Sequence, residues 1–211
     1  HEHGPGGEDT MLHQLQAAAA TPAFPIVRIA VNETARFKRA LDMGALGVMV
    51  PYVSTADEAR AAVAAMRYPP HGVRGVAKFN RGAGFGGDFE EYYLHAHERL
   101  VTVIQIETPQ AVENIDAIAA IDGVDVLFVG PTDLSYNMGI RDQLESETFT
   151  AALRKVAEAA RRHGKAAGIL VHQNALVPKV RALGYTFTAL GSDGGAVRAG
   201  LLGFVSALKA P

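Results

Sequence analysis

The sequence predicts an α/β fold built around a parallel β-sheet, and three observations support this prediction. Short apolar runs alternate with helical stretches along the chain. Most runs are rich in Val, Ile, Leu or Phe without strict polar alternation, as in strands buried on both faces. The length of 211 residues suffices for one domain with a large core. Six strand–helix units fit either a parallel β/α barrel or a doubly wound sheet.

The expected strands and helices follow one another in order. The apolar runs predict strands at Pro25–Val31, Gly47–Pro51, Val101–Glu107, Val124–Gly130, Ala166–Val171 and Thr186–Gly191. Helical patterns predict helices at Thr10–Ala20, Glu33–Met43, Thr55–Met66, Gln110–Ala120, Glu147–His163, Asn174–Leu183 and Gly194–Leu208.

Local signals support several of these boundaries. Thr108 followed by Pro109 opens a helix in the favoured order of cap and then proline. Gly164 after His163 is typical of a helix stop. Tyr68–Asp88, by contrast, contains six glycines and shows no regular pattern. A segment of that length in a compact domain is commonly a lid or an oligomer contact.

Composition excludes several classes of function. The net charge is −2 and no basic block occurs, so we expect no nucleic-acid partner. No apolar run approaches the roughly 18–20 residues of a membrane span, so we expect no membrane partner. Cysteine is absent, which excludes disulfides, thiolate catalysis and cysteine-based zinc sites, and fits a cytoplasmic protein.

Two carboxylates close two consecutive apolar runs. Glu107 ends the run that begins at Val101, and Asp133 follows the run that begins at Val124. The carboxyl ends of parallel strands meet at the edge where α/β proteins bind ligands. Hard carboxylate oxygens at that edge suit a divalent ion such as Mg²⁺ or Mn²⁺. The alternative is that both acids only cap the helices that follow them.

The segment Gly130-Pro131-Thr132-Asp133 adds a second feature at the same edge. A glycine at a strand end lets a ligand approach the backbone closely. The amides that follow, at the start of a helical turn, can bind an anion such as a substrate carboxylate. A plain strand-to-helix turn is the alternative.

Three further residues are candidates for chemistry. Arg28 lies inside an apolar run and needs an anionic partner, which is either a substrate or a protein carboxylate such as Asp42. His3, in a glycine-rich turn, is of the type that transfers protons near neutral pH, although a terminal histidine is often only solvated. Asp42 ends a helix, where an acid is unfavourable, which favours a specific role over a surface position.

Six segments together resemble the HpcH/HpaI class II pyruvate aldolase family, which includes 4-hydroxy-2-oxoheptanedioate and 2-dehydro-3-deoxyglucarate aldolases. The resemblance covers essentially the whole chain, and the last two segments are its most specific part. They are Glu2-His3-Gly4, Val27-Arg28, Leu41-Asp42-Met43-Gly44, Tyr68 to Gly75, Gln105-Ile106-Glu107-Thr108 and Phe128 to Ser135.

The resemblance implies a fold and a reaction. The fold is a (β/α)8 TIM barrel, and the reaction makes or cleaves the bond between the enolate of pyruvate or hydroxypyruvate and an aldehyde. The substrates would be 4-hydroxy-2-oxo acids from aromatic or sugar acid catabolism, and the cofactor a divalent metal ion (Mg²⁺, Mn²⁺ or Co²⁺). Family members form dimers and hexamers, so we expect a homo-oligomer.

The resemblance also implies roles for individual residues. Glu107 and Asp133 match the metal ligands, and Arg28 matches the arginine that stabilises the enolate. His3 matches the acid/base histidine, with Asp42 near it. Positions that match pyruvate-binding residues are Gln105, Gly130, Pro131, Thr132 and Asp133.

The chain departs from the family pattern at its start. The family's first strand, first helix and most of its second strand, about 40 residues, would precede His1; a complete barrel typically takes about 250 residues. We therefore expect residues 1–211 to be one barrel domain that is incomplete at its N-terminus. Two alternatives to the aldolase are a carbon–carbon lyase acting on CoA thioesters, of the malyl-CoA and citrate lyase type, and a non-catalytic subunit that retains the fold.

Overall fold

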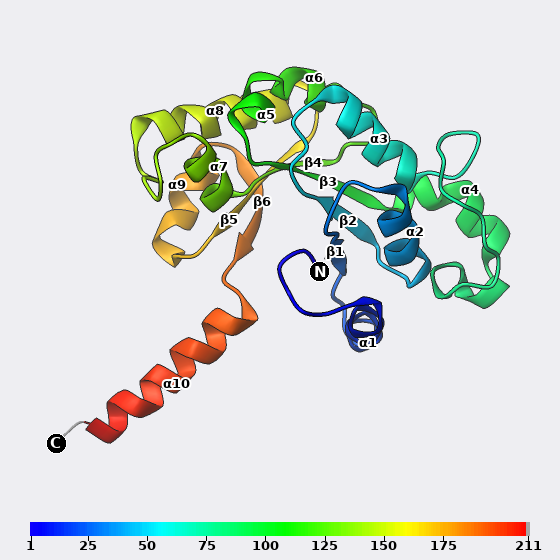
Figure 1. The fold of residues 1–211 in the computed structure, drawn as a ribbon, viewed down its shortest axis with the longest axis horizontal. Helices are drawn as coiled ribbons and strands as arrows, with labels where there is room; N and C mark the ends of the chain where they lie inside the picture. The colour runs from blue at the N-terminus through cyan, green and yellow to red at the C-terminus, as the bar shows by residue number, and fades with distance from the viewer. Residues whose placement is uncertain (210–211) are drawn as a thin grey trace.

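The computed structural model describes residues 1–209, and its centre is a six-stranded sheet. All neighbouring strands are parallel, and their order in the sheet follows the order in the chain. The sheet curls, with helices on its outer side (Figure 1). The strands are β1 (Ile26–Arg28), β2 (Gly47–Val50), β3 (Val101–Ile106), β4 (Val126–Val129), β5 (Ala166–Val171) and β6 (Tyr185–Leu190).

The strand order decides between the two architectures that the sequence left open. A doubly wound sheet reverses its strand order at a switch point and carries helices on both faces. Here the order never reverses, and the sheet is curled with an outer layer of helices (Figure 1). The prediction of a parallel α/β fold is confirmed, and the architecture is of the barrel type.

The helices alternate with the strands. The α-helices are α1 (Glu8–Ala18), α2 (Thr34–Asp42), α3 (Ala56–Met66), α4 (Phe89–Arg99), α5 (Pro109–Glu113), α6 (Ile115–Ala119), α7 (Pro131–Asn137), α8 (Glu147–Arg162), α9 (Val177–Ala182) and α10 (Asp193–Lys209). Two short 3₁₀ helices, η1 (Arg81–Gly86) and η2 (Asn174–Leu176), complete the described structure.

The main core lies between the sheet and the helices. It contains strand residues such as Val48, Ile104 and Leu127 and helix residues such as Phe37 and Phe149, all with at most 1% of their surface exposed. A smaller apolar cluster, around Val103, Val126 and Phe128, occupies the other face of the sheet. Burial on both faces explains why these strands lack polar alternation.

Local sequence determines where several helices begin. α3 begins with a capping box: the Thr55 hydroxyl accepts a hydrogen bond from the Glu58 amide, and the Glu58 carboxylate accepts one from the Thr55 amide. α5 begins with the predicted Thr108 cap and Pro109. The predicted helix Gln110–Ala120 is divided at Asn114, whose side chain donates a hydrogen bond to the carbonyl of Ser54.

The irregular segment Tyr68–Asp88 packs at the amino-terminal edge of the sheet. Its Arg74 is fully buried, donates hydrogen bonds to Asp42 and Tyr92, and stacks over the ring of Tyr68 at 4.3 Å. These contacts join the segment to the end of α2. The segment therefore lies away from the carboxyl ends of the strands, and it does not act as a lid over them.

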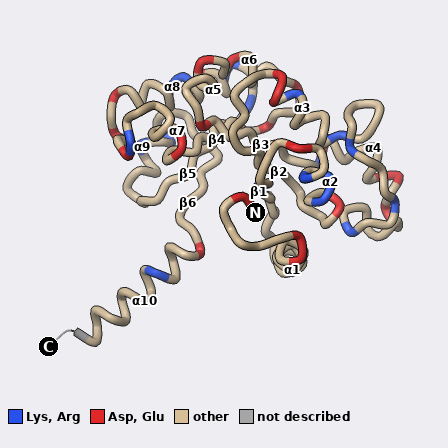
Figure 2. The backbone as a smooth tube through the Cα atoms, in the orientation of Figure 1, with Lys and Arg blue, Asp and Glu red and all other residues tan. Residues whose placement is uncertain are grey.

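The last helix extends away from the rest of the protein (Figure 1). The side chains of α10 that the structure describes are exposed, including Val197, Leu201 and Phe204. Figure 2 shows acidic and basic residues interspersed over the helices around the sheet, whereas α10 carries few of either. Within residues 1–209, no helix is both long and apolar enough to cross a membrane.

Candidate active site

The two predicted acids lie at the carboxyl ends of adjacent strands. Glu107 directly follows β3, and Asp133 lies in the first turn of α7, which begins shortly after β4. β3 and β4 pair in parallel, with Ile106 opposite Val129, so both acids reach the same edge of the sheet. The side chain of Asn137 donates a hydrogen bond of 2.8 Å to the Glu107 carbonyl and joins α7 to the end of β3.

Glu107 is nearly fully buried, with 2% of its surface exposed, and protein groups hold both of its carboxylate oxygens. The Tyr52 amide donates to Oε2 at 3.1 Å, and the Gln105 side chain donates to Oε1 at 2.6 Å. Gln105 and Glu107 are two residues apart in extended backbone, so their side chains lie on one face. The Gln105 Oε1 atom is buried and has no hydrogen-bond partner among the described residues.

Gly130 makes room for the Glu107 carboxylate. A β-carbon at this position would lie 2.3 Å from Glu107 Oε1 and 3.0 Å from Glu107 Cδ. Any residue can adopt the backbone conformation of Gly130, whose φ is −88°. A glycine is needed here because a side chain would have no room, and not because of the backbone angles. The Glu107 carboxylate approaches the Gly130 backbone closely. The approach of a ligand to the same backbone stays a prediction.

Asp133 is linked to Glu107 through Tyr52. The Tyr52 hydroxyl donates a hydrogen bond of 2.9 Å to Asp133 Oδ1, while its amide bonds Glu107. Pro131 is buried as the first residue of α7, and the Thr132 carbonyl accepts a hydrogen bond from the buried Ser135 hydroxyl. The sequence analysis did not identify Tyr52. Its one signal was its position just beyond the apolar run that forms β2.

Burial changes the acidity of Glu107. Loss of contact with water raises its pKa to about 7, and the negative charges of Asp133 and Glu2 act in the same direction. The Tyr52 amide and the positive charge of Arg28 oppose this shift without cancelling it. The end of β3 is therefore a place where negative charge is concentrated and only partly compensated by the protein.

Arg28, at the end of β1, has a different ion-pair partner from the one suggested by the sequence. Its Nε atom lies 2.9 Å from Oε2 of Glu2, whereas the suggested partner Asp42 forms an ion pair with Arg74. The close N–O distance makes an ion pair, although its geometry does not satisfy a hydrogen bond. The His3 ring lies 3.6 Å from Glu2, and its side chain is 67% exposed. Glu2, His3 and Arg28 thus come together near the acidic edge.

Asp42 is not brought to this site within the chain. It ends α2, which runs back from the end of β1 to the start of β2, so it lies at the opposite edge of the sheet. Its carboxylate accepts a hydrogen bond of 2.8 Å from the buried Arg74. The unfavourable acid at a helix end is explained by this buried guanidinium and not by contact with His3.

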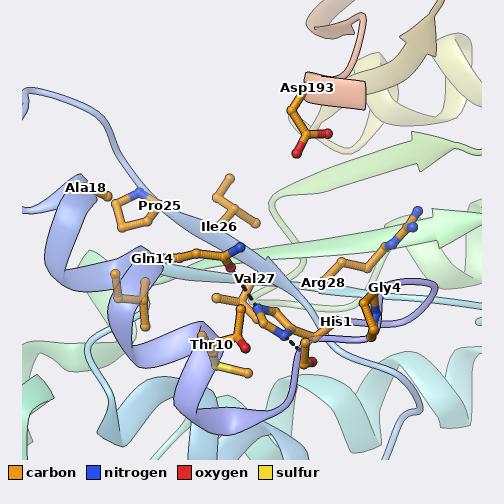
Figure 3. Close-up of a pocket in the computed structure, with 14 residues that line it drawn as sticks. His1, Gly4, Thr10, Gln14, Ala18, Pro25, Ile26, Val27, Arg28 and Asp193 are labelled. Atoms are coloured by element: carbon orange, nitrogen blue, oxygen red, sulfur yellow. Dashed lines mark hydrogen bonds between the residues drawn. The ribbon is translucent and has the colours of Figure 1, made fainter. Parts of the chain in front are cut away.

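A cavity of about 710 Å³ lies beside Arg28 (Figure 3). α1 and β1 form its walls, and His1 and the segment Gly4-Pro5-Gly6 border it. Figure 3 also shows Asp193, from the start of α10, facing the cavity across from the strand. This cavity could admit a small molecule to the side of β1 that carries Arg28.

The acidic residues fit a divalent cation with a partly open coordination sphere. Within residues 1–209 no group of three or more His, Asp or Glu side chains is close enough to hold a metal by itself. Glu107 and Asp133, which both accept hydrogen bonds from Tyr52, are the two carboxylates that could hold such an ion, and two protein ligands would leave positions for water and a chelating substrate. Burial of the Glu107 carboxylate, which raises its pKa, means that its charged form would be stabilised by a bound cation.

Comparison with known proteins agrees with the fold. The curled parallel sheet and the acids at its carboxyl edge define an α/β enzyme of the barrel type. The chain belongs to the HpcH/HpaI aldolase/citrate lyase family, whose model matches residues 2–199. The prediction of this family is confirmed.

Named relatives show what kind of enzyme the family contains. The 5-keto-4-deoxy-D-glucarate aldolase of Shigella dysenteriae serotype 1 is 39% identical over 197 residues, which are 93% of this chain and 77% of that protein. Aldolases are carbon–carbon lyases, and the prediction of this enzyme class is confirmed.

Solved structures are also similar. A family protein from Burkholderia cenocepacia J2315 is 32% identical with a TM-score of 0.93, and the match covers 99% of this chain and 83% of that one. The citrate synthase SbnG is 28% identical with a TM-score of 0.88, over 99% of this chain and 81% of that one.

Proposed function

We propose that this chain is a metal-dependent class II aldolase that acts on 4-hydroxy-2-oxo acids. It would cleave or form the bond between a pyruvate or hydroxypyruvate enolate and an aldehyde. The observation that carries the proposal is that Glu107 and Asp133 follow adjacent parallel strands at one edge of the sheet and both accept hydrogen bonds from Tyr52. The 5-keto-4-deoxy-D-glucarate aldolases support it, because their name describes a keto sugar acid as substrate.

Glu107 and Asp133 would hold the divalent ion, for which Mg²⁺, Mn²⁺ and Co²⁺ are the candidates. When bound, the ion would act as a Lewis acid toward the keto group of the substrate. Gln105 supports this assignment, because its side chain orients Oε1 of Glu107 and its own buried carbonyl remains free for a polar ligand.

Arg28 would stabilise the charge that develops on the keto oxygen. Its guanidinium is 35% exposed and is held by Glu2, so a charged donor is already oriented before the substrate binds. Preorganised charge of this kind is commonly the largest contribution to catalysis. The Gly130–Asp133 backbone, which lies next to Glu107, is our candidate for the position of the substrate carboxylate.

His3 would transfer the proton. In the cleavage direction His3 takes the proton of the C4 hydroxyl, the C3–C4 bond breaks, and its electron pair remains on the pyruvate part as an enolate. Protonation of C3 then gives pyruvate, and the other product is the aldehyde. The exposed His3 ring is free to approach a bound substrate. We propose no catalytic role for Asp42 within this chain, because it lies at the other edge of the sheet.

Release of pyruvate from a 4-hydroxy-2-oxo acid tests the proposal directly. Glu107→Ala and Asp133→Ala are each expected to abolish the release that depends on added Mn²⁺. Asp122→Ala removes an acid that is 91% exposed and serves as the matched control with wild-type activity. Full activity of either site variant in the presence of a chelator would overturn the metal assignment.

A second candidate function is carbon–carbon bond chemistry on a CoA thioester or a related acid. The similarity to a citrate synthase at 28% identity favours keeping this candidate. Parallel assays with a 2-oxo acid alone and with CoA esters separate the two. Pyruvate release that needs no CoA ester supports the aldolase, and turnover of CoA esters alone supports the second candidate.

We further propose that the architecture is a (β/α)8 barrel with residues 1–211 in one domain. The curled six-stranded sheet supports this, and so do the longer solved relatives, of which the chain covers 83% in one case. A homo-oligomer, a cytoplasmic location and a role in aromatic or sugar acid catabolism remain predictions.

A further inference from the structure

Tyr52 has an unusual backbone at the carboxyl end of β2. Its φ is +53°, in the left-handed region that residues other than glycine rarely adopt. Such conformations are unfavourable and persist where surrounding contacts fix them. Among the contacts of Tyr52 are hydrogen bonds to both members of the acidic pair.

A single residue thus contacts both carboxylates. The Tyr52 amide donates to Glu107 Oε2 at 3.1 Å, and its hydroxyl donates to Asp133 Oδ1 at 2.9 Å. β2 pairs with β3 and not with β4, so the tyrosine side chain crosses the end of β3 to reach α7. The left-handed backbone directs the amide at one acid while the side chain reaches the other.

The bonds leave both acids able to bind a cation. Each oxygen of Glu107 accepts one hydrogen bond, from Tyr52 or Gln105, and keeps a second lone pair. On Asp133 the bond from Tyr52 engages Oδ1 alone. A tyrosine hydroxyl, with an ordinary pKa of about 10, remains a donor at neutral pH.

We propose that Tyr52 is a positioning residue that holds Glu107 and Asp133 in the arrangement that takes up a divalent cation. The inference rests on the proposed function. Donors behind metal-binding carboxylates fix the orientation of the ligands, and their loss typically lowers metal affinity about 10- to 100-fold. Tyr52 orients two ligands at once.

The experiment is calorimetric titration of Mn²⁺ into the wild type and Tyr52→Phe. The variant loses the hydroxyl and keeps the amide, and its side chain is 49% exposed, so the fold is preserved. We expect Mn²⁺ to bind about tenfold more weakly. Saturating Mn²⁺ is expected to restore most of the pyruvate release, because the residue acts through the metal ligands.

Tyr136→Phe is the matched control. Tyr136 is 45% exposed, and its hydroxyl also donates to an aspartate, Asp142, at 3.3 Å. It lies on α7 beside Asp133, so a general effect of losing a tyrosine hydroxyl there would appear in this variant. We expect its Mn²⁺ affinity to equal that of the wild type.

The outcomes are distinct. Wild-type or tighter Mn²⁺ binding by Tyr52→Phe overturns the role of Tyr52 and leaves the proposed function intact; tighter binding would mean that the hydroxyl competes with the cation. Equal weakening in Tyr136→Phe also overturns it. If the wild type itself takes up no Mn²⁺, the proposed function fails and the role of Tyr52 fails with it.

Discussion

Replacing Gly130 with alanine is expected to displace the Glu107 carboxylate. The new methyl group would lie 2.3 Å from Oε1, 2.9 Å from Cγ and 3.0 Å from Cδ of Glu107, so the side chain must move. Movement breaks the bond to Gln105 at 2.6 Å, and the bond to Tyr52 at 3.1 Å is weakened or lost. Overpacking in a buried place typically costs about 1–3 kcal/mol. For a chain of this size that lowers Tm by roughly 2–12 °C.

The assay is thermal unfolding together with Mn²⁺ titration. Gly130→Ala is expected to lower Tm and to weaken Mn²⁺ binding. Gly200→Ala is the control, because a β-carbon there meets no atom within 4 Å and alanine favours the helix. In a Glu107→Ala background the clash is absent, so Gly130→Ala should then leave Tm nearly unchanged. Wild-type Tm and Mn²⁺ affinity in Gly130→Ala, or an equal loss of Tm in both backgrounds, would refute the reasoning.

Three further predictions concern pH, a buried ion pair and a helix cap. In metal-free protein, burial raises the pKa of Glu107 from 4.5 to about 7. Between pH 4.5 and about 7 the folded state then binds more protons than the unfolded state, so the free energy of unfolding should fall by about 3 kcal/mol as the pH rises through this range. Urea unfolding at several pH values in the presence of a chelator measures this fall. Glu107→Gln should remove the pH dependence. Arg74→Ala leaves Asp42 without its buried partner and should lower the free energy of unfolding by about 3 kcal/mol. Arg60→Ala, on the surface, should lower it by under about 1 kcal/mol. Urea unfolding measures both. Thr55→Ala should destabilise α3 by about 1 kcal/mol, and no change in Tm would contradict the capping box.

Much of the sheet could be predicted because buried strands leave a clear apolar signal. Ala166–Val171 was predicted to the residue, and all six strands lie where apolar runs occur. α4 was not predicted as an element, because only Phe89 and Ala96 of its residues are buried and its pattern is correspondingly weak. The division of one predicted helix at Asn114 depends on a bond to Ser54, which is distant in sequence.

Some residues of the candidate site could likewise be predicted from the sequence, and others could not. Strand ends could be read from the sequence, so the meeting of Glu107 and Asp133 was predictable. The pairing of Arg28 with Glu2 and of Asp42 with Arg74 depends on how separate segments pack, and composition carries no sign of it. Tyr52 depends on a left-handed backbone at a residue that is not glycine, for which the sequence offers no signal.

The chain-ordered sheet has a consequence for how this protein can diverge. Every residue assigned a role at the site, from Glu2 to Asn137, precedes the segment that forms α8, β5, β6 and α10. Of the residues after Asn137, Asp193 comes near the site, because it lines the cavity beside Arg28. Mutational drift in the last third of the chain can therefore alter stability and surface contacts while the acids and their donors stay unchanged. The residues whose replacement would change the chemistry directly lie before residue 138.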